Sequence, residues 1–170
     1  MRFLPLLLLV TAVAGLFDYQ HHHEGDVCKL YPESLRYNGQ PVDDVPSIQE
    51  AFRRCGNNAK VIFTDHIFNI GSVMNTTNLV NVDVILHGVL QFSTDIAYWR
   101  ANAFPVIFQN QSTAWFFGGT NVTFRGEGGW IDGQGQVWYT FNKNGANMPG
   151  RPIVITVVNS TNVWIDGLRM

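Results

Sequence analysis

One repeat most limits what this chain can fold into. It consists of a strand, a turn, a second strand and a glycine, and it returns at intervals of 40 and 41 residues. Asn81, Asn121 and Asn162 mark the interval, and each precedes a short strand pattern of period two. A short strand that buries one face is not stable alone, whereas stacking the next coil on it pairs its backbone. The repeat therefore predicts an all-β solenoid, in which each asparagine bonds to the backbone of neighbouring coils.

One helix is predicted before the repeats, over residues 46–55. Apolar residues fall at i, i+3, i+4 and i+7 and form one stripe: Ile48, Ala51, Phe52 and Cys55. Ser47 and Glu50 resemble a capping box, and Asp43 and Asp44 lie where they would cap the N-terminus. We expect this amphipathic helix to cover one apolar end of the solenoid.

The N-terminus has the pattern of a secretory signal peptide. Arg2 precedes an apolar run over residues 3–13, and Ala12-Val13-Ala14 forms a small-x-small cleavage site. We expect cleavage after Ala14, a flexible mature N-terminus over residues 15–27 that includes the histidines 21–23, and an extracellular location. After cleavage no membrane association is expected.

Secretion determines how the cysteines and the glycosylation sequons are interpreted. Cys28 and Cys55 are predicted to pair, since disulfides persist in an oxidising compartment. Glycosylation is predicted at Asn75, Asn110 and Asn159. The sequon at Asn121 belongs to the repeat, so we expect it to be buried and unmodified.

Composition excludes several classes of function. The net charge of −2 gives no basic footprint for nucleic acid, and 46% hydrophobic residues argue against disorder. Two cysteines with no histidine at ligand spacing make a poor zinc site. We expect a monomer with no metal and no cofactor.

Several segments, in order along the chain, resemble one family. They are VDDVPSIQEAFRRCG from Val42, IGSVMNTTNLVNVDV from Ile70, FQNQSTAWFFGG from Phe108 and IDGQGQVWY from Ile131. They are similar to the N-terminal portion of fungal exopolygalacturonases of glycoside hydrolase family 28. The resemblance implies a right-handed parallel β-helix, with a cap over 28–56, the first coils over 57–170 and the C-terminal coils missing.

The resemblance also implies a reaction, the inverting hydrolysis of α-1,4 linkages in polygalacturonic acid or of related bonds in rhamnogalacturonan. That mechanism needs one acid and one base on opposite sides of the bond. The family's Asn-Thr-Asp, Gly-His-Gly and Arg-Ile-Lys motifs are absent from the sequence. Asp43-Asp44 is interpreted as a helix cap, and Asp132 and Asp166 as turn residues. We assign no catalytic residue and expect the chain alone to be inactive.

Two long loops are predicted over 93–105 and 134–152, and they hold the candidate substrate contacts. Aromatic rings stack on the apolar faces of sugars, which makes Tyr98, Trp99, Trp138 and Tyr139 the candidates. Arg100 and Arg151 are candidates to pair with galacturonate carboxylates. The expected partner is therefore pectin or polygalacturonate.

Other functions stay open at this point. The chain is alternatively a non-catalytic pectin-binding fragment, a relative of rhamnogalacturonan hydrolases, or a truncated product without a stable fold. A calcium-dependent pectate lyase is disfavoured, because no cluster of acidic calcium ligands is visible.

Overall fold

The computed structural model describes residues 17–20, 26–107, 110–143 and 150–170. The predicted signal peptide 1–14 and the histidines 21–23 lie outside these ranges. No helix in the described part of the chain is long and apolar enough to cross a membrane. The structure consists mainly of strands with few helices, as the repeat predicts.

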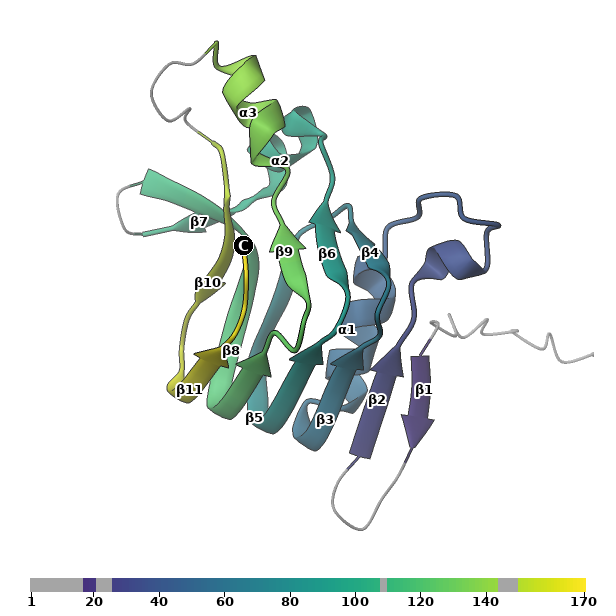
Figure 1. The fold of residues 1–170 in the computed structure, drawn as a ribbon. Helices are drawn as coiled ribbons and strands as arrows, with labels where there is room; N and C mark the ends of the chain where they lie inside the picture. Colours follow the sequence, from purple (N-terminus) through teal and green to yellow (C-terminus); the bar gives the residue numbers. More distant parts are fainter. Residues whose placement is uncertain (1–16, 21–25, 108–109, 144–149) are drawn as a thin grey trace, which may run out of the picture.

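Most strands belong to one large sheet whose central members run parallel (Figure 1). The parallel strands are β2 (Asp26–Leu30), β3 (Asn57–Phe63), β5 (Met74–Leu86), β8 (Gln111–Arg125), β10 (Ile153–Val157) and β11 (Thr161–Asp166). Both β10 and β11 pair with β8. Antiparallel partners lie at the margins, where β1 (Phe17–Gln20) pairs with β2 and β7 (Phe104–Val106) with β8. Thus β1 lies within the segment that was expected to be flexible.

A second parallel sheet faces the first. It contains β4 (Ile67–Ile70), β6 (Val89–Phe92) and β9 (Trp130–Asp132). The chain alternates between the sheets, from β3 to β4, to β5, to β6, to β8, to β9, and then to β10 and β11. Each return adds one coil on top of the previous one, so successive repeats are neighbours in space (Figure 1).

The asparagines of the repeat form a ladder along one edge of these coils. The Nδ2 of Asn162 donates to Oδ1 of Asn121 at 2.8 Å, Asn121 donates to Asn81 at 3.0 Å, and Asn81 donates to Asn58 at 2.8 Å. The ladder therefore joins side chain to side chain, whereas bonds to the backbone were expected. The expected burial of Asn121 is also wrong, because its side chain is exposed.

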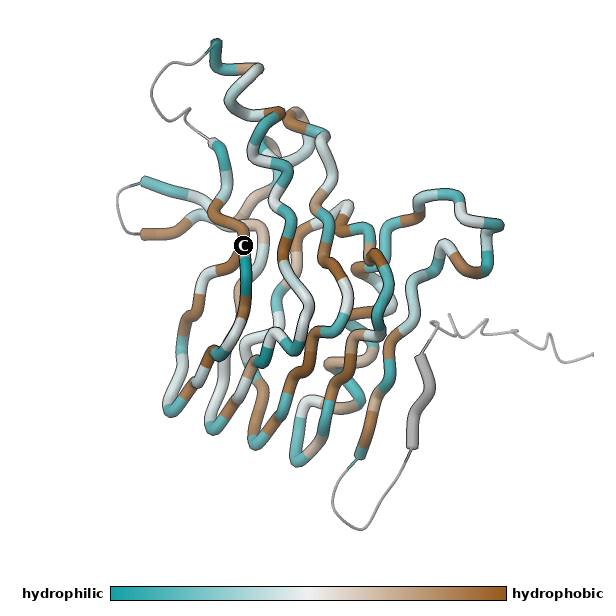
Figure 2. The backbone as a smooth tube through the Cα atoms, viewed as in Figure 1, coloured by the Kyte–Doolittle hydropathy of each residue, from teal (hydrophilic) through white to brown (hydrophobic). Residues whose placement is uncertain are grey.

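The backbone explains why asparagine stands at this edge. All four ladder residues have positive φ, between 48° and 56°. Asparagine tolerates this left-handed conformation better than most residues do. Figure 2 shows hydrophilic residues at these turns and hydrophobic stretches along the strands.

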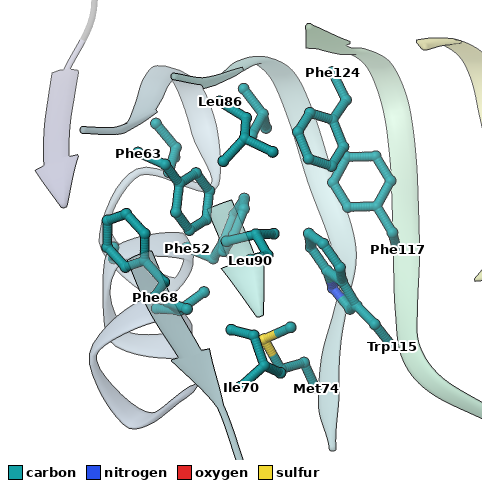
Figure 3. Close-up of a cluster of buried hydrophobic side chains, with 14 of the residues drawn as sticks. Phe52, Phe63, Phe68, Ile70, Met74, Leu86, Leu90, Trp115, Phe117 and Phe124 are labelled. Atoms are coloured by element: carbon teal, nitrogen blue, oxygen red, sulfur yellow. The ribbon is translucent and has the colours of Figure 1, made fainter. Parts of the chain in front are cut away.

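The space between the sheets is filled by large apolar side chains (Figure 3). Trp115 is fully buried, and its ring centroid lies 5.4 Å from that of Phe117 and 5.8 Å from that of Phe124. Phe63 and Phe68 bring the two sheets together at 5.3 Å. This column of rings is the core that the inward-facing strand positions predict.

One end of the core is covered by α1 (Val45–Arg54), within one residue of the prediction at each end. Phe52 packs against Phe63 and Trp115, at centroid distances of 6.3 and 6.5 Å. The predicted disulfide is present, with Cys28 and Cys55 both fully buried and their Cα atoms 6.0 Å apart. It ties the end of α1 to β2.

The start of α1 differs from the prediction. Ser47 Oγ donates to the carboxylate of Glu33 in a short helical turn (Glu33–Leu35), and Glu50 pairs with Arg53 and Arg54. The capping box is therefore absent. Its role passes to Asp43, whose Oδ1 accepts from the backbone N–H of Val45 at 3.1 Å.

Candidate functional site

Two short helices lie beyond the carboxyl ends of strands of the second sheet (Figure 1). The first, α2 (Ile96–Asn102), follows β6, and the second, α3 (Gly135–Phe141), follows β9. Both fall in segments that were predicted to be loops. Asp95 caps α2 by accepting from the N–H of Tyr98 at 2.9 Å. Asp132 Oδ1 accepts from the N–H of Gln134 at 3.0 Å, which confirms its predicted role in a turn.

Three of the four candidate aromatic residues take part in packing these helices. Trp99 is 2% exposed, and its Nε1 donates to the carbonyl oxygen of Ser93 at 2.9 Å. Trp138 is 5% exposed. Tyr98 is half-buried, and its hydroxyl accepts from the N–H of Val73 at 3.2 Å. Most of their ring surface is therefore already covered by protein.

Tyr139 differs, because 53% of its surface is exposed. The guanidinium carbon of Arg151 lies 5.5 Å from the centre of its ring, within the range of a cation–π contact. Arg151 itself is half-buried. Arg100, the other candidate cation, is exposed and lies against Gly150.

Tyr139 and Arg151 line a cavity of about 580 Å³ between α3, β9 and β10. Trp99, Ile131 and Trp138 contribute apolar surface to it. None of the described residues that line this cavity is an aspartate or a glutamate. A cavity with an apolar wall, an exposed phenol ring and one guanidinium suits a ligand with an apolar face and a negative charge.

The acidic pair at 43–44 lies elsewhere and holds the chain together. Asp44 is 1% exposed, and it accepts from the backbone N–H of Glu33 at 2.5 Å and of Asn69 at 2.6 Å. Burial raises the pKa of Asp44 to about 6, against the opposing effect of these two hydrogen bonds. Both carboxylate oxygens are occupied by backbone donors, which suits a structural role.

The described residues contain no group of three or more His, Cys, Asp or Glu side chains that could hold a metal ion. His66 is exposed, and its Nδ1 lies 3.0 Å from Thr64 Oγ1. Nδ1 of His87 lies 3.2 Å from the carbonyl oxygen of Glu127. These histidines therefore belong to turns.

The turn after β9 also lines this cavity, and it was not predicted from the sequence. Gly133 and Gly135 line the cavity on either side of Gln134, which has a φ of 51°. A Cβ at Gly133 would lie 2.8 Å from Val154 Cγ2. The glycine-rich stretch could have indicated this turn, because glycine is common where the backbone approaches its surroundings closely.

Curated relatives cover most of the chain. An alpha-L-rhamnosidase from Aspergillus niger is 38% identical over 95% of this chain. A protein of Aspergillus flavus, named as a galacturan 1,4-alpha-galacturonidase, is 38% identical over 97% of it. Another from the same species, named as an exopolygalacturonase, is 38% identical over 80%. The chain is a homologue of fungal glycoside hydrolases of family 28. The predicted resemblance is thus confirmed.

The chain matches only part of the length of each of these relatives. The chain spans 37%, 38% and 31% of the length of these three relatives. No family model matches the chain. Among solved structures, an endo-xylogalacturonan hydrolase from Aspergillus tubingensis aligns with a TM-score of 0.62 at 24% identity, over 84% of this chain and 36% of that one. The match to this solved structure shows a similarity of fold.

Proposed function

We propose that the chain is part of a secreted pectin-degrading glycoside hydrolase of the polygalacturonase type. In this proposal the stacked coils belong to a right-handed parallel β-helix, and the whole protein hydrolyses α-1,4-galacturonosyl linkages with inversion. The stacking of parallel strands in two sheets supports the architecture. The names of the relatives support the substrate class.

The observation that carries the proposal for this chain is the cavity with Tyr139 and Arg151. A galacturonate ring offers an apolar C–H face to Tyr139 and a carboxylate to the guanidinium of Arg151. Guanidinium and carboxylate form bidentate, charge-assisted hydrogen bonds. Trp138 and Trp99 support the wall behind these groups, and Tyr98 fixes α2.

Binding, rather than bond cleavage, is the role proposed for these residues. Inverting hydrolysis needs two carboxyl groups roughly 6.5–9.5 Å apart with water between them. No described acid lines the cavity, and Asp44, Asp95 and Asp132 are held by backbone donors. No residue is therefore assigned as catalytic. A relative named as a rhamnosidase favours rhamnogalacturonan as the second candidate substrate.

Calorimetric titration of the purified chain with trigalacturonate tests the proposal. We expect saturable binding that Arg151→Gln weakens at least about tenfold, because one charge-assisted hydrogen bond contributes about 1.5–3 kcal/mol. Arg100→Gln is the matched control, since Arg100 does not line the cavity. Equal binding by both variants and the unchanged chain would contradict the proposed site.

Secretion is tested by expression in a yeast that processes signal peptides. The mature chain is expected to begin at Gly15 and to carry N-glycans at Asn75, Asn110 and Asn159, all of which are exposed. Mass spectrometry before and after enzymatic deglycosylation measures both features. An intact N-terminus on a protein that stays inside the cell would rule out the proposed processing.

A further inference from the structure

A separate cavity lies between α1 and the first half of β5. The pairing of β3 with β5 begins only where Asn57 stands opposite Val80. Residues 74–79 of β5 therefore have α1 beside them in place of a strand, and their register with β8 is interrupted between Thr76 and Leu79. The cavity left at this irregular edge measures about 550 Å³. It shares no lining residue with the cavity at Tyr139.

The lining of this cavity combines apolar surface with amide groups. Phe52 and Leu79 are 4% and 3% exposed and supply the apolar part. Gln49, Asn57 and Asn78 are exposed and supply neutral amides. A cavity of this size and mixed lining suits a small ligand that has both an apolar face and groups that form hydrogen bonds.

The charged residues of the cavity favour a neutral ligand. None of the described residues that line it is an aspartate or a glutamate. Arg53 and Arg54 line it, but each is paired with Glu50 on the same helix, at 2.6 and 2.8 Å. An anion would have to displace this carboxylate from two guanidinium groups, whereas a neutral ligand leaves the pairs as they are.

The β5 wall of the cavity carries a site for covalent attachment of a sugar. Asn75, Thr76 and Thr77 all line the cavity, and they form a glycosylation sequon. Asn75 is exposed, and its Oδ1 accepts from Thr77 Oγ1 at 2.9 Å. The amide nitrogen, which is the atom that carries an N-glycan, takes no part in this bond. The other predicted sites, Asn110 and Asn159, do not line the cavity.

We propose that the first N-acetylglucosamine of a glycan on Asn75 occupies this cavity and secures α1 to β5. This sugar is neutral. Its ring face and acetyl methyl match the apolar surface of Phe52 and Leu79, and its hydroxyl and acetamido groups match the amides of Gln49 and Asn78. Covalent attachment keeps the sugar at a high effective concentration beside the cavity. The inference rests on the proposed secretion of the chain and is independent of the proposed pectin site.

Three forms of the chain made in yeast test this inference by urea unfolding. One is fully glycosylated, one is trimmed by an endoglycosidase to a single N-acetylglucosamine at each site, and one is stripped by an amidase. We expect the first two to be equally stable. The folding equilibrium constant of the third should be about fivefold to tenfold lower, the effect of losing about one hydrogen bond. Asn75→Gln, which adds no charge, should reproduce this loss.

Thr161→Ala is the control for a general effect of glycans. It removes the sequon of Asn159, and its own side chain is exposed. Because Asn159 does not line the cavity, the trimmed and stripped forms of this variant should differ in stability as those of the unchanged chain do. Mass spectrometry of the peptide that contains Asn75 establishes whether this residue carries the glycan.

A double-variant cycle tests whether the sugar lies in the cavity. Gln49→Ala should lower the folding equilibrium constant of the trimmed chain at least about twofold more than that of Asn75→Gln, because the contact exists only when the sugar is present. Gln136→Ala is the matched control, since Gln136 is an exposed amide on α3 that does not line the cavity. Its effect should be the same in both backgrounds.

The outcomes separate this inference from the proposed function. Equal stability of the trimmed and stripped forms, or an equal effect of Gln49→Ala in both backgrounds, overturns the inference and leaves the proposed pectin site intact. A loss of stability on trimming to one sugar overturns the assignment to the first sugar. An unmodified Asn75 overturns the inference together with the predicted glycosylation of that residue.

Discussion

At the scale of single residues, Asp44 shows that an acidic motif can serve the fold and not a reaction. An Asp-Asp pair resembles catalytic machinery, yet both residues fasten the start of α1 to the neighbouring coil. Asp44 joins three segments, since it accepts from Glu33 and Asn69 and its own N–H donates to the carbonyl of Asn69 at 2.8 Å. Asp44 stands at the N-cap position of α1, but its side chain makes no capping hydrogen bond there, so the predicted cap holds for Asp43 alone. The partners of Asp44 lie 11 and 25 residues away and were not predicted.

The raised pKa of Asp44 makes stability depend on pH. Burial raises the pKa from 3.8 to about 6 in the folded protein, so the folded state favours the neutral acid. This group therefore contributes most below about pH 4, and its contribution falls by up to about 3 kcal/mol as pH rises towards 6 and then stays level. Asp44→Asn, which cannot ionise, should remove that part of the slope. Urea unfolding at pH 4, 5, 6 and 7 measures it.

Asp65→Asn is the control for this prediction, because Asp65 is exposed. It should leave the pH dependence of the unfolding free energy as it is in the unchanged chain. If Asp44→Asn and the unchanged chain show the same slope between pH 4 and 6, the account of the buried acid is incorrect.

At the scale of elements, the asparagine ladder was predictable in position and not in partner. A period of about 40 residues places Asn81, Asn121 and Asn162 at the same corner of successive coils. The bonding atoms depend on side-chain rotamers, which a repeat does not specify. Asn58 escaped detection because only 23 residues separate it from Asn81. The coil between them lacks the insertion with α2 and β7 that lengthens the next coil.

Two substitutions of Asn121 separate the contribution of the ladder's hydrogen bonds from that of its left-handed backbone conformation. Asn121→Ala loses hydrogen bonds on both sides and places alanine at a φ of 55°, so a loss of about 2 kcal/mol in unfolding free energy is expected. Asn121→Gly loses the same bonds without the conformational cost and should lose about half as much. Urea unfolding of both variants measures the two losses. Equal losses of unfolding free energy in the two variants would show that the left-handed backbone conformation does not contribute to the effect.

The short helices beside the site were missed for a related reason. Each has seven residues, which is too few for a helical period to be visible in the sequence. The sequence placed their aromatic residues in two separate loops, and the structure brings Trp99, Trp138 and Tyr139 to one cavity. Which ring is buried and which is exposed depends on how α2 and α3 pack on the coils, and this separates Trp99 and Trp138 from Tyr139.

At the scale of the whole molecule, stacking provides the core and the disulfide closes its beginning. The fold class followed from the repeat because coils of like sequence bury like positions. Cys28 and Cys55 enclose a span of 27 residues that includes α1. The bond limits the freedom of the unfolded chain and keeps the end of α1 on β2.

Removal of the disulfide should therefore destabilise the whole fold. The double variant Cys28→Ala/Cys55→Ala is expected to lose about 3 kcal/mol, the value for a loop of this length. Alanine avoids placing a hydroxyl at two fully buried positions. Urea unfolding under non-reducing conditions measures the loss, and treating the unchanged chain with a reductant should reproduce it. Unaltered stability of the double variant would contradict this role.

The most direct test of the central claim is a crystal structure of the chain soaked with trigalacturonate. The account predicts one sugar ring against Tyr139, with its carboxylate on the guanidinium of Arg151 and the apolar wall of Trp138 behind it. Trigalacturonate bound instead against α1, or at any place that leaves Arg151 without a carboxylate, would contradict it.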